Sequence, residues 1–157
     1  RGLQGVRTPH LKWLLPELLP DVGRMIVLDT DLIVRADLHD LWSTPLGEHP
    51  AAAVARGTIG YSCDTPLLMS LGASPDAAYF NTGVLLLAAD AWRAEGLTER
   101  CRAFALRHAA DLRSADQTVY NGVLAAPGRI VTLDDRFNHT LYPDTPSCGF
   151  DHPRVGD

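Results

Sequence analysis

Two aspartates, Asp29 and Asp31, stand one residue apart in the apolar stretch MIVLDTDLIV. A buried carboxylate costs several kcal/mol unless a partner neutralises it, so a pair of them needs an explanation. Alternate residues of a strand point to the same side, and the two carboxylates converge if the strand continues through them. A converging pair suits a hard cation such as Mg²⁺ or Mn²⁺. The plainer alternative is that one aspartate caps a turn while the other is solvated.

A second polar interruption occurs in the apolar stretch AYFNTGVLLL. Asn81 needs a hydrogen-bonding partner there, and Gly83 permits a ligand to approach the backbone closely. The structural alternative is a β-bulge with a satisfied amide. This stretch is therefore a candidate for one wall of a binding site.

Two more polar groups follow. Asp116 and Gln117 open the segment SADQTVYNG, in which Ser114 and Gln117 have the spacing of a capping box. Asn138 stands in DDRFNHT, directly after a short apolar run. We accept capping for Ser114 and retain the other three as candidate site residues.

In this order the motifs resemble the retaining glycosyltransferases of family 8. The matching stretches lie between residues 11 and 138 and read LKWLLPELLP, VLDTDLIVRADLHDLW, YFNTGVLLLAADAWR, DQTVYN and RFN. The resemblance implies a GT-A fold, which is a Rossmann-like nucleotide-diphospho-sugar transferase architecture. It also implies a nucleotide-sugar donor, most often UDP-glucose or UDP-galactose, a carbohydrate or other hydroxyl acceptor, and Mn²⁺ or Mg²⁺.

The same resemblance implies a role for each matching position. Lys12 stands where the family usually has an arginine that reaches the donor, and lysine keeps the charge without the forked geometry. The expected site residues are Asp29 and Asp31 for the metal, Lys12, Asn81, Thr82, Gly83 and Asn138 for the substrate, and Asp116 and Gln117 for catalysis.

Glycosyl transfer passes through an oxocarbenium-like state while a charged diphosphate departs. Retention of configuration needs a nucleophile on the opposite face of the sugar or attack from the leaving-group face. Glutamine is a poor nucleophile, so we favour the second route, with Gln117 as a dipole that stabilises positive charge. Asp116 could share that task or hold sugar hydroxyls, and both roles remain open.

The chain matches only the middle of the family's domain. We find no strand before Leu11 of the kind that binds uracil and ribose, and no C-terminal segment that supplies a third metal ligand and a phosphate-binding lysine. The neighbours of His152 do not match that segment. We therefore expect residues 1–157 to form a single domain that is the central portion of a family 8 catalytic domain and a fragment of a longer enzyme.

Two other functions compete with this one. A phosphohydrolase of the haloacid dehalogenase type also begins with a strand that runs into D-x-D, but it follows this motif with small residues, whereas Leu32 and Ile33 follow here. A truncated, non-catalytic sugar-nucleotide-binding remnant is the second alternative.

Composition narrows the class of protein. The 157 residues carry a net charge of −5 and no basic cluster, which disfavours nucleic acid as a partner, and no apolar run is long enough to cross a membrane. The cysteines Cys63, Cys101 and Cys148 are odd in number and far apart, which predicts buried thiols in a reducing compartment, the cytoplasm. Abundant arginine beside a single lysine favours a bacterial origin.

These side chains must be positioned by alternating strands and helices. Continuous apolar runs predict strands over 24–28, 51–55, 80–89 and 129–133. Helical spacing predicts helices from Thr8-Pro9 to about residue 19 and over 37–42, 98–109 and 114–124, one more from Asp90, and a long loop carrying a helix over 57–78. The alternation predicts an α/β fold with a mostly parallel sheet flanked by helices on both faces, and the candidate site at its carboxyl edge.

Overall fold

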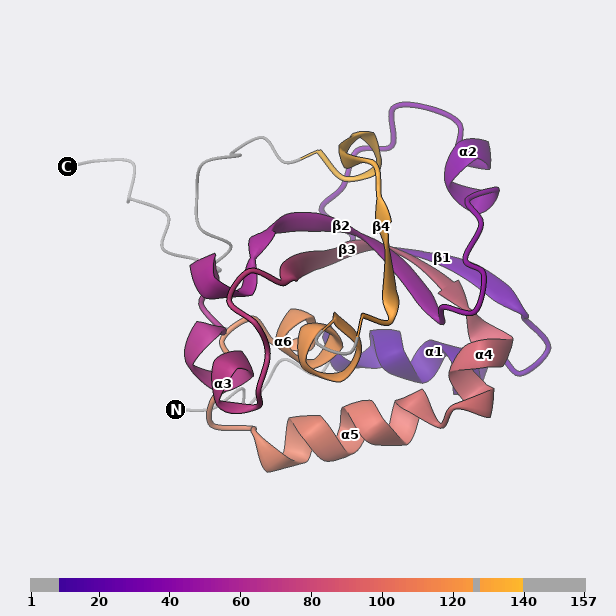
Figure 1. The fold of residues 1–157 in the computed structure, drawn as a ribbon. Coiled ribbons are helices and arrows are strands. Elements are labelled where there is room, and N and C mark those ends of the chain that lie inside the picture. Colours follow the sequence, from indigo (N-terminus) through magenta and orange to yellow (C-terminus); the bar gives the residue numbers. More distant parts are fainter. Residues whose placement is uncertain (1–8, 126–127, 140–157) are drawn as a thin grey trace.

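The computed structural model describes residues 9–125 and 128–139, and its centre is a sheet of four strands. In spatial order the strands are β1 (Arg24–Leu28), β3 (Ala78–Ala88), β2 (Ala51–Thr58) and β4 (Ile130–Leu133) (Figure 1). β3 pairs antiparallel with both neighbours, while β2 and β4 are parallel. β1, β2 and β4 therefore run in one direction and β3 runs against them. The sheet is mixed, and the expectation of a mostly parallel sheet holds only approximately.

Short helices connect the strands. They are η1 (Pro9–Leu14), α1 (Leu15–Leu18), α2 (His39–Trp42), η2 (Ile59–Tyr61), α3 (Thr65–Ser70), α4 (Ala89–Ala94), α5 (Leu97–Arg107), α6 (Asp116–Tyr120), η3 (Asn121–Ala125) and η4 (Asp135–Phe137). The first predicted helix divides into a 3₁₀ segment and one α-helical turn, with Pro16 in the first turn of α1, where its missing N–H costs nothing. The helix predicted over 114–124 divides into α6 and the π-helical η3.

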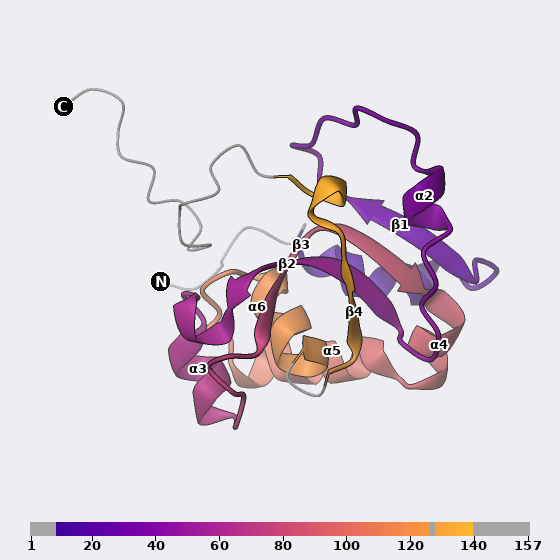
Figure 2. The ribbon, with the colours of Figure 1, turned by 45° about the horizontal axis from the view of Figure 1, so that its top comes forward.

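One face of the sheet carries the larger core. Leu85 and Leu87 of β3 pack there with Trp92 of α4, Cys101 of α5 and Tyr120 of α6, all of them fully buried. Both views show α5 and α6 on this side of the sheet (Figure 1, Figure 2). The helices of this face fix the position of α6, which carries two of the candidate site residues.

The opposite face has a smaller core. Leu41 of α2 and Leu46 pack against Val54, Leu86 and Leu133 of the sheet. Figure 2 shows α2 beside β1 on this side. Both faces are therefore covered, as the apolar strands predict.

The cysteines differ in state. Cys101 is a buried free thiol, as predicted, whereas Cys63 is disulfide-bonded and not the thiol that we expected. This difference removes the argument for a reducing compartment. In the part of the chain that the structure describes, no helix combines the length and apolar character needed to cross a bilayer.

Candidate functional site

The first aspartate lies just beyond the end of β1. The strand ends at Leu28, and the backbone N–H of Asp29 donates to the carbonyl of Gly83 at 2.8 Å. The chain then turns through Thr30 and Asp31, and Asp31 is exposed. Strand geometry therefore does not place both carboxylates on one side, because the strand stops before the pair.

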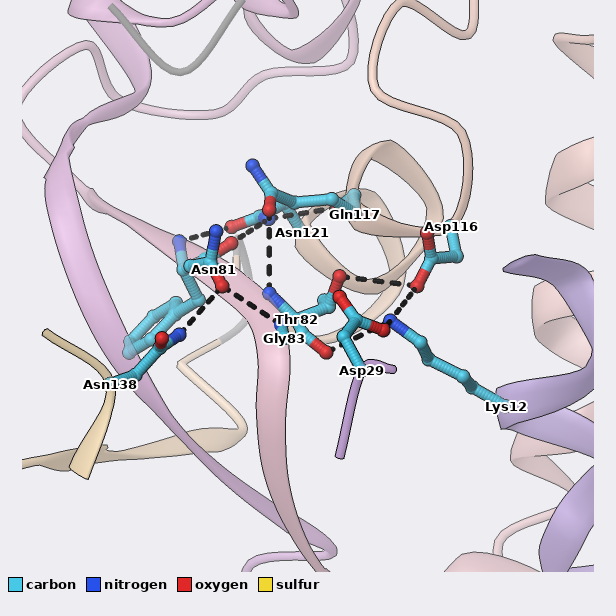
Figure 3. A network of polar contacts seen from close by, with 10 residues as sticks. Lys12, Asp29, Asn81, Thr82, Gly83, Asp116, Gln117, Asn121 and Asn138 are labelled. Atoms are coloured by element: carbon cyan, nitrogen blue, oxygen red, sulfur yellow. Dashed lines mark hydrogen bonds and ion pairs between the residues drawn. The ribbon is translucent and has the colours of Figure 1, made fainter. Parts of the chain in front are cut away.

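Lys12 occupies the centre of the site. It comes from η1, and its ammonium nitrogen lies 2.6 Å from Asp29 Oδ1, 2.8 Å from Asp116 Oδ2 and 3.0 Å from the carbonyl oxygen of Thr82 (Figure 3). An ammonium group has three donors, and here each faces one acceptor. One cation thus joins the end of β1, the middle of β3 and the start of α6.

The electrostatics of Lys12 follow from these contacts. Burial by itself lowers the pKa of a lysine, but the charges of Asp116 and Asp29 and their hydrogen bonds outweigh it, and the pKa of Lys12 is raised. Lys12 is therefore a cation at every physiological pH, and it partly neutralises two carboxylates.

A β-bulge shapes the middle of β3. The pairing with β2 runs from Ala53 opposite Leu85 directly to Val54 opposite Asn81, so residues 82–84 are extra on the β3 side. The Oδ1 atom of Asn81 accepts from Gly83 N at 2.8 Å and from Asn138 Nδ2 at 2.7 Å. The sequence presents the bulge and the polar site as alternatives, but in the structure the bulge itself carries the polar site. β-Bulges are common beside functional sites.

Gly83 leaves little space for a side chain. A Cβ atom there would lie 3.0 Å from Asn81 Oδ1 and 3.3 Å from Asp29 Oδ2. The close approach of the backbone to Asp29 therefore depends on glycine at this position.

The first turn of α6 faces this bulge. Gln117 Oε1 accepts from Thr82 N at 3.3 Å, and Thr82 Oγ1 donates to Asp116 Oδ2 at 3.1 Å. The predicted capping box is wrong: Ala115, not Ser114, is the N-cap residue, and no side chain caps the helix there. Gln117 is turned toward Thr82, which agrees with a role in the site.

The residue before Asp116 has an unusual backbone. Ala115 has φ 49° and ψ −117°, and it alone has a positive φ among the non-glycine residues that the structure describes. Such a conformation costs of order 1–3 kcal/mol and persists only where its surroundings enforce it. The strain lies directly beside two candidate catalytic residues.

Asn121 links β3 to α6 beside the site. Its side chain binds the backbone N–H and C=O of Phe80, each at 2.8 Å, and also the carbonyl of Gln117 at 2.8 Å. Beyond Val84 the register of β1 with β3 ends, so the amide of Asn121 takes the place of a neighbouring strand. Its membership of the DQTVYN motif was the signal for this role. Thr118 belongs to the same motif, whereas Asp64, to which the Thr118 hydroxyl donates, had no such signal.

The structure thus joins eight of the nine expected residues. The connected set is Lys12, Asp29, Asn81, Thr82, Gly83, Asp116, Gln117 and Asn138 (Figure 3). Asp31 stands apart, and its carboxylate makes no hydrogen bond or ion pair within residues 9–125 and 128–139. His152 lies outside the described residues.

The donor set fits a hard divalent cation in part. Asp29 and Asp31 carry carboxylate oxygens of the kind that such cations prefer, but the Asp29 Oδ1 atom is already bound by Lys12 and Asp31 stands apart from the connected set. No cluster of three His, Cys, Asp or Glu side chains that could hold a metal exists in the described part of the chain. A cation held here would need further ligands beyond these two carboxylates.

Sequence comparison places these motifs in a known family. Residues 6–148 match the profile of Glycosyl transferase family 8. The chain is 25% identical over 157 residues to the glycosyltransferase GlyE of Streptococcus pneumoniae, covering 96% of this chain and 34% of that protein. It is 32% identical to the human xylosyl- and glucuronyltransferase LARGE2, covering 92% of this chain and 20% of LARGE2.

Solved structures agree with this result. The galactosyltransferase LgtC, in complex with donor and acceptor sugar analogues, superposes with a TM-score of 0.70 at 25% identity, over 82% of this chain and 45% of LgtC. The GlyE crystal structure gives 0.64 at 27% identity, over 87% of this chain and 30% of GlyE. The architecture is therefore the GT-A fold.

The chain spans well under half of the length of the curated relatives that it matches. Within that span the family match leaves no support for a phosphohydrolase of the haloacid dehalogenase type. The order of motifs, the shared fold and the match over residues 6–148 lead to one conclusion: the chain belongs to glycosyltransferase family 8.

Proposed function

We propose that this chain is part of a retaining glycosyltransferase that moves a hexose from UDP-glucose or UDP-galactose to a hydroxyl acceptor. The observation that carries the proposal is the Lys12 bridge, which unites Asp29 with Asp116 beside Gln117. The site lies beyond the carboxyl ends of β1 and β4, where open α/β sheets bind their ligands. LgtC, a galactosyltransferase with the same fold, supports a sugar donor of this kind.

The residues of the site have distinct tasks in this proposal. The Oε1 atom of Gln117, the negative end of its amide dipole, is held by the N–H of Thr82, and its second lone pair faces the anomeric carbon. That dipole stabilises the positive charge that develops on the sugar, and the leaving-group face is the face of attack. Asp116 is held by both Thr82 and Lys12, so its carboxylate is oriented before a substrate arrives.

Asp29 and Asp31 would hold Mn²⁺ or Mg²⁺ together with oxygens of the donor. When bound, such a cation supplies electrostatic stabilisation to the departing diphosphate. Lys12 adds a fixed positive charge at the same place, since it contacts Asp29 directly. Asn81, Thr82, Gly83 and Asn138 form the wall against which the donor sugar rests.

A panel of nucleotide sugars tests the proposal. The full-length protein is incubated with UDP- and other nucleotide-linked hexoses, with Mn²⁺ or with a chelator, and the release of nucleoside diphosphate is measured. We expect metal-dependent hydrolysis of a UDP-hexose. Binding of UDP and Mn²⁺ without turnover of any donor would instead identify a non-catalytic sugar-nucleotide-binding remnant.

A further inference from the structure

Asp64, which is not among the expected site residues, has a buried carboxylate that contacts Thr118 of α6. Asp64 is fully buried and accepts three hydrogen bonds: from the Tyr79 hydroxyl, from Arg113 N at 3.2 Å and from Thr118 Oγ1 at 2.9 Å. No cation pairs with it in the described part of the chain. Burial of an unpaired carboxylate is costly, so these three donors are what keeps it in place.

Asp64 does not cap the helix that it precedes. It occupies the N-cap position of α3, where an aspartate normally binds its own helix, but its side chain makes no such bond. It points instead toward Tyr79 and Thr118. Burial, and then the charge of Asp64, raise the pKa of Tyr79, so its hydroxyl remains a donor.

The contacts of Asp64 continue to the turn before α6. The Thr118 hydroxyl donates to Asp64 and accepts from Ser114 N at 3.0 Å. The carbonyl of Ser114 accepts from Gln117 N at 3.0 Å. Asp64 therefore holds Arg113 directly and Ser114 through one hydroxyl, on the side where the chain enters the turn.

The turn held in this way is the strained one. Ala115 has a positive φ, and Asp116 and Gln117 follow it immediately. A residue other than glycine keeps this conformation only if its neighbours enforce it. Bonds to Asp64 and Thr118 hold the two backbone N–H groups just before Ala115, those of Arg113 and Ser114.

We propose that Asp64 is a positioning residue that clamps the strained Ser114–Ala115 turn and so fixes Asp116 and Gln117 against Thr82 and Lys12. The inference rests on the proposed glycosyl transfer for its kinetic consequence. Its structural part, the coupling of Asp64 to Ala115, does not depend on activity.

The first test is Asp64→Asn in the full-length protein. Oδ1 of Asp64 accepts from Arg113 N and Thr118, and Oδ2 accepts from Tyr79. In asparagine one of these oxygens becomes an NH₂ donor and the negative charge is lost, so one side of the group loses its acceptor and the bonds that remain are weaker. We expect kcat for donor hydrolysis to fall roughly tenfold while the KM for the donor changes much less, because the misplaced groups act in the transition state. Asp76→Asn, the same change at an exposed position of the same segment, is the control.

The second test separates a clamp from general support of the fold. Glycine adopts a positive φ readily, so Ala115→Gly reduces the backbone strain that the contacts of Asp64 have to offset. We expect Asp64→Asn to lower kcat much less in the Ala115→Gly protein than in the parent. Equal loss of kcat in both backgrounds, or a parallel change in kcat and KM, would overturn the proposal.

The same pair of substitutions gives a readout without catalysis. In urea unfolding, Asp64→Asn should reduce the free energy of unfolding less in the Ala115→Gly background than in the parent. If the parent protein turns over no donor, the proposed function fails, while this cycle still decides for or against the clamp. Equal losses of unfolding free energy would refute it.

Discussion

At the scale of single residues, Lys12 joins the charged groups of this site. Its side chain is 13% exposed, and its carboxylate partners on Asp116 and Asp29 are 10% and 37% exposed. An ammonium group so placed offsets the repulsion between two acids from distant parts of the chain. Removing Lys12 leaves both acids without their cation, which lowers the free energy of unfolding more than removing all three charges together.

We expect Lys12→Met to lower the free energy of unfolding by roughly 2–3 kcal/mol, less than for a fully buried pair because Asp29 is partly solvated. The pKa of Lys12 is raised above its ordinary 10.5, so its contribution is complete below that pH and is lost only as the pH rises through the folded-state pKa. Chemical denaturation should therefore show the same loss at pH 6 and pH 8. Arg107→Met, at an exposed position of α5, should change stability by only about 0.5 kcal/mol or less.

Asp31 is expected to behave in the opposite way. It is exposed and makes no polar contact within the described residues, so Asp31→Ala should change the free energy of unfolding by about 0.5 kcal/mol or less. Loss of metal-dependent donor turnover in this variant would then come from a lost ligand. Asp21→Ala, at an exposed aspartate before β1, is the matched control. Full turnover of Asp31→Ala would remove this aspartate from the metal site.

Gln117 should matter for rate more than for binding. Gln117→Ala removes a dipole whose proposed effect is greatest in the transition state, so we expect kcat to fall at least about tenfold with little change in donor affinity. Steady-state kinetics measure kcat, and calorimetry with a non-hydrolysable UDP-hexose analogue, which retains the sugar that Gln117 would face, measures the donor affinity. Equal losses in both would show that the side chain contributes to uniform binding only.

At the scale of elements, η1 is held in place by a relay of hydrogen bonds that starts in α4. Trp92 Nε1 donates to Thr98 Oγ1 at 3.0 Å, and Thr98 Oγ1 donates to the carbonyl of Trp13 at 3.0 Å. Trp13 is the neighbour of Lys12, so this relay fixes the segment that delivers the ammonium group. α4 and α5 thus take part in building the site although neither contributes a residue to it.

Thr98→Val removes this relay without changing the volume of the side chain much. The buried N–H of Trp92 then loses its acceptor, and we expect the free energy of unfolding to fall by about 1–3 kcal/mol. Thr132→Val, at an exposed position of β4, should have little effect or stabilise slightly, since valine is favoured in strands. Similar unfolding midpoints for the two variants would argue against the relay.

At the scale of the whole molecule, the larger core isolates its thiol from solvent. Cys101 is fully buried beside α6, and burial raises the pKa of its thiol to about 12. The thiolate is the reactive form, so we expect alkylation of Cys101 in the native protein to be slow and to accelerate with denaturant. Peptide mass spectrometry after timed alkylation measures this, and rapid native modification would contradict the packing of α5 against the sheet.

The sequence predicts the site better than the sheet that carries it. The strand that ends before Asp29 and the bulge at Asn81 are both visible as polar residues that interrupt apolar runs. The direction of β3 is not, because an apolar strand between helices has the same composition whichever way it runs. The predicted capping role of Gln117 is wrong, because its side-chain oxygen accepts from Thr82 N and does not bind the start of its own helix.

Other features are beyond sequence reasoning for a different reason. Ala115 gives no sign of its positive φ, because that conformation is imposed by contacts from Asp64 and Thr118 and does not come from the residue itself. Asp64 lies in a polar segment where an aspartate is unremarkable. Residues of this kind become visible only when the three-dimensional contacts are known.

The geometry around Lys12 has one more consequence. Because a single nitrogen atom is shared by Asp29 and Asp116, anything that draws Asp29 away leaves the ammonium to Asp116 and the carbonyl of Thr82 alone. A displacement of Asp29 at the end of β1 therefore changes the contacts of Asp116 in the first turn of α6. The Lys12 ammonium group thus couples Asp29, beyond the end of β1, to Asp116 in α6.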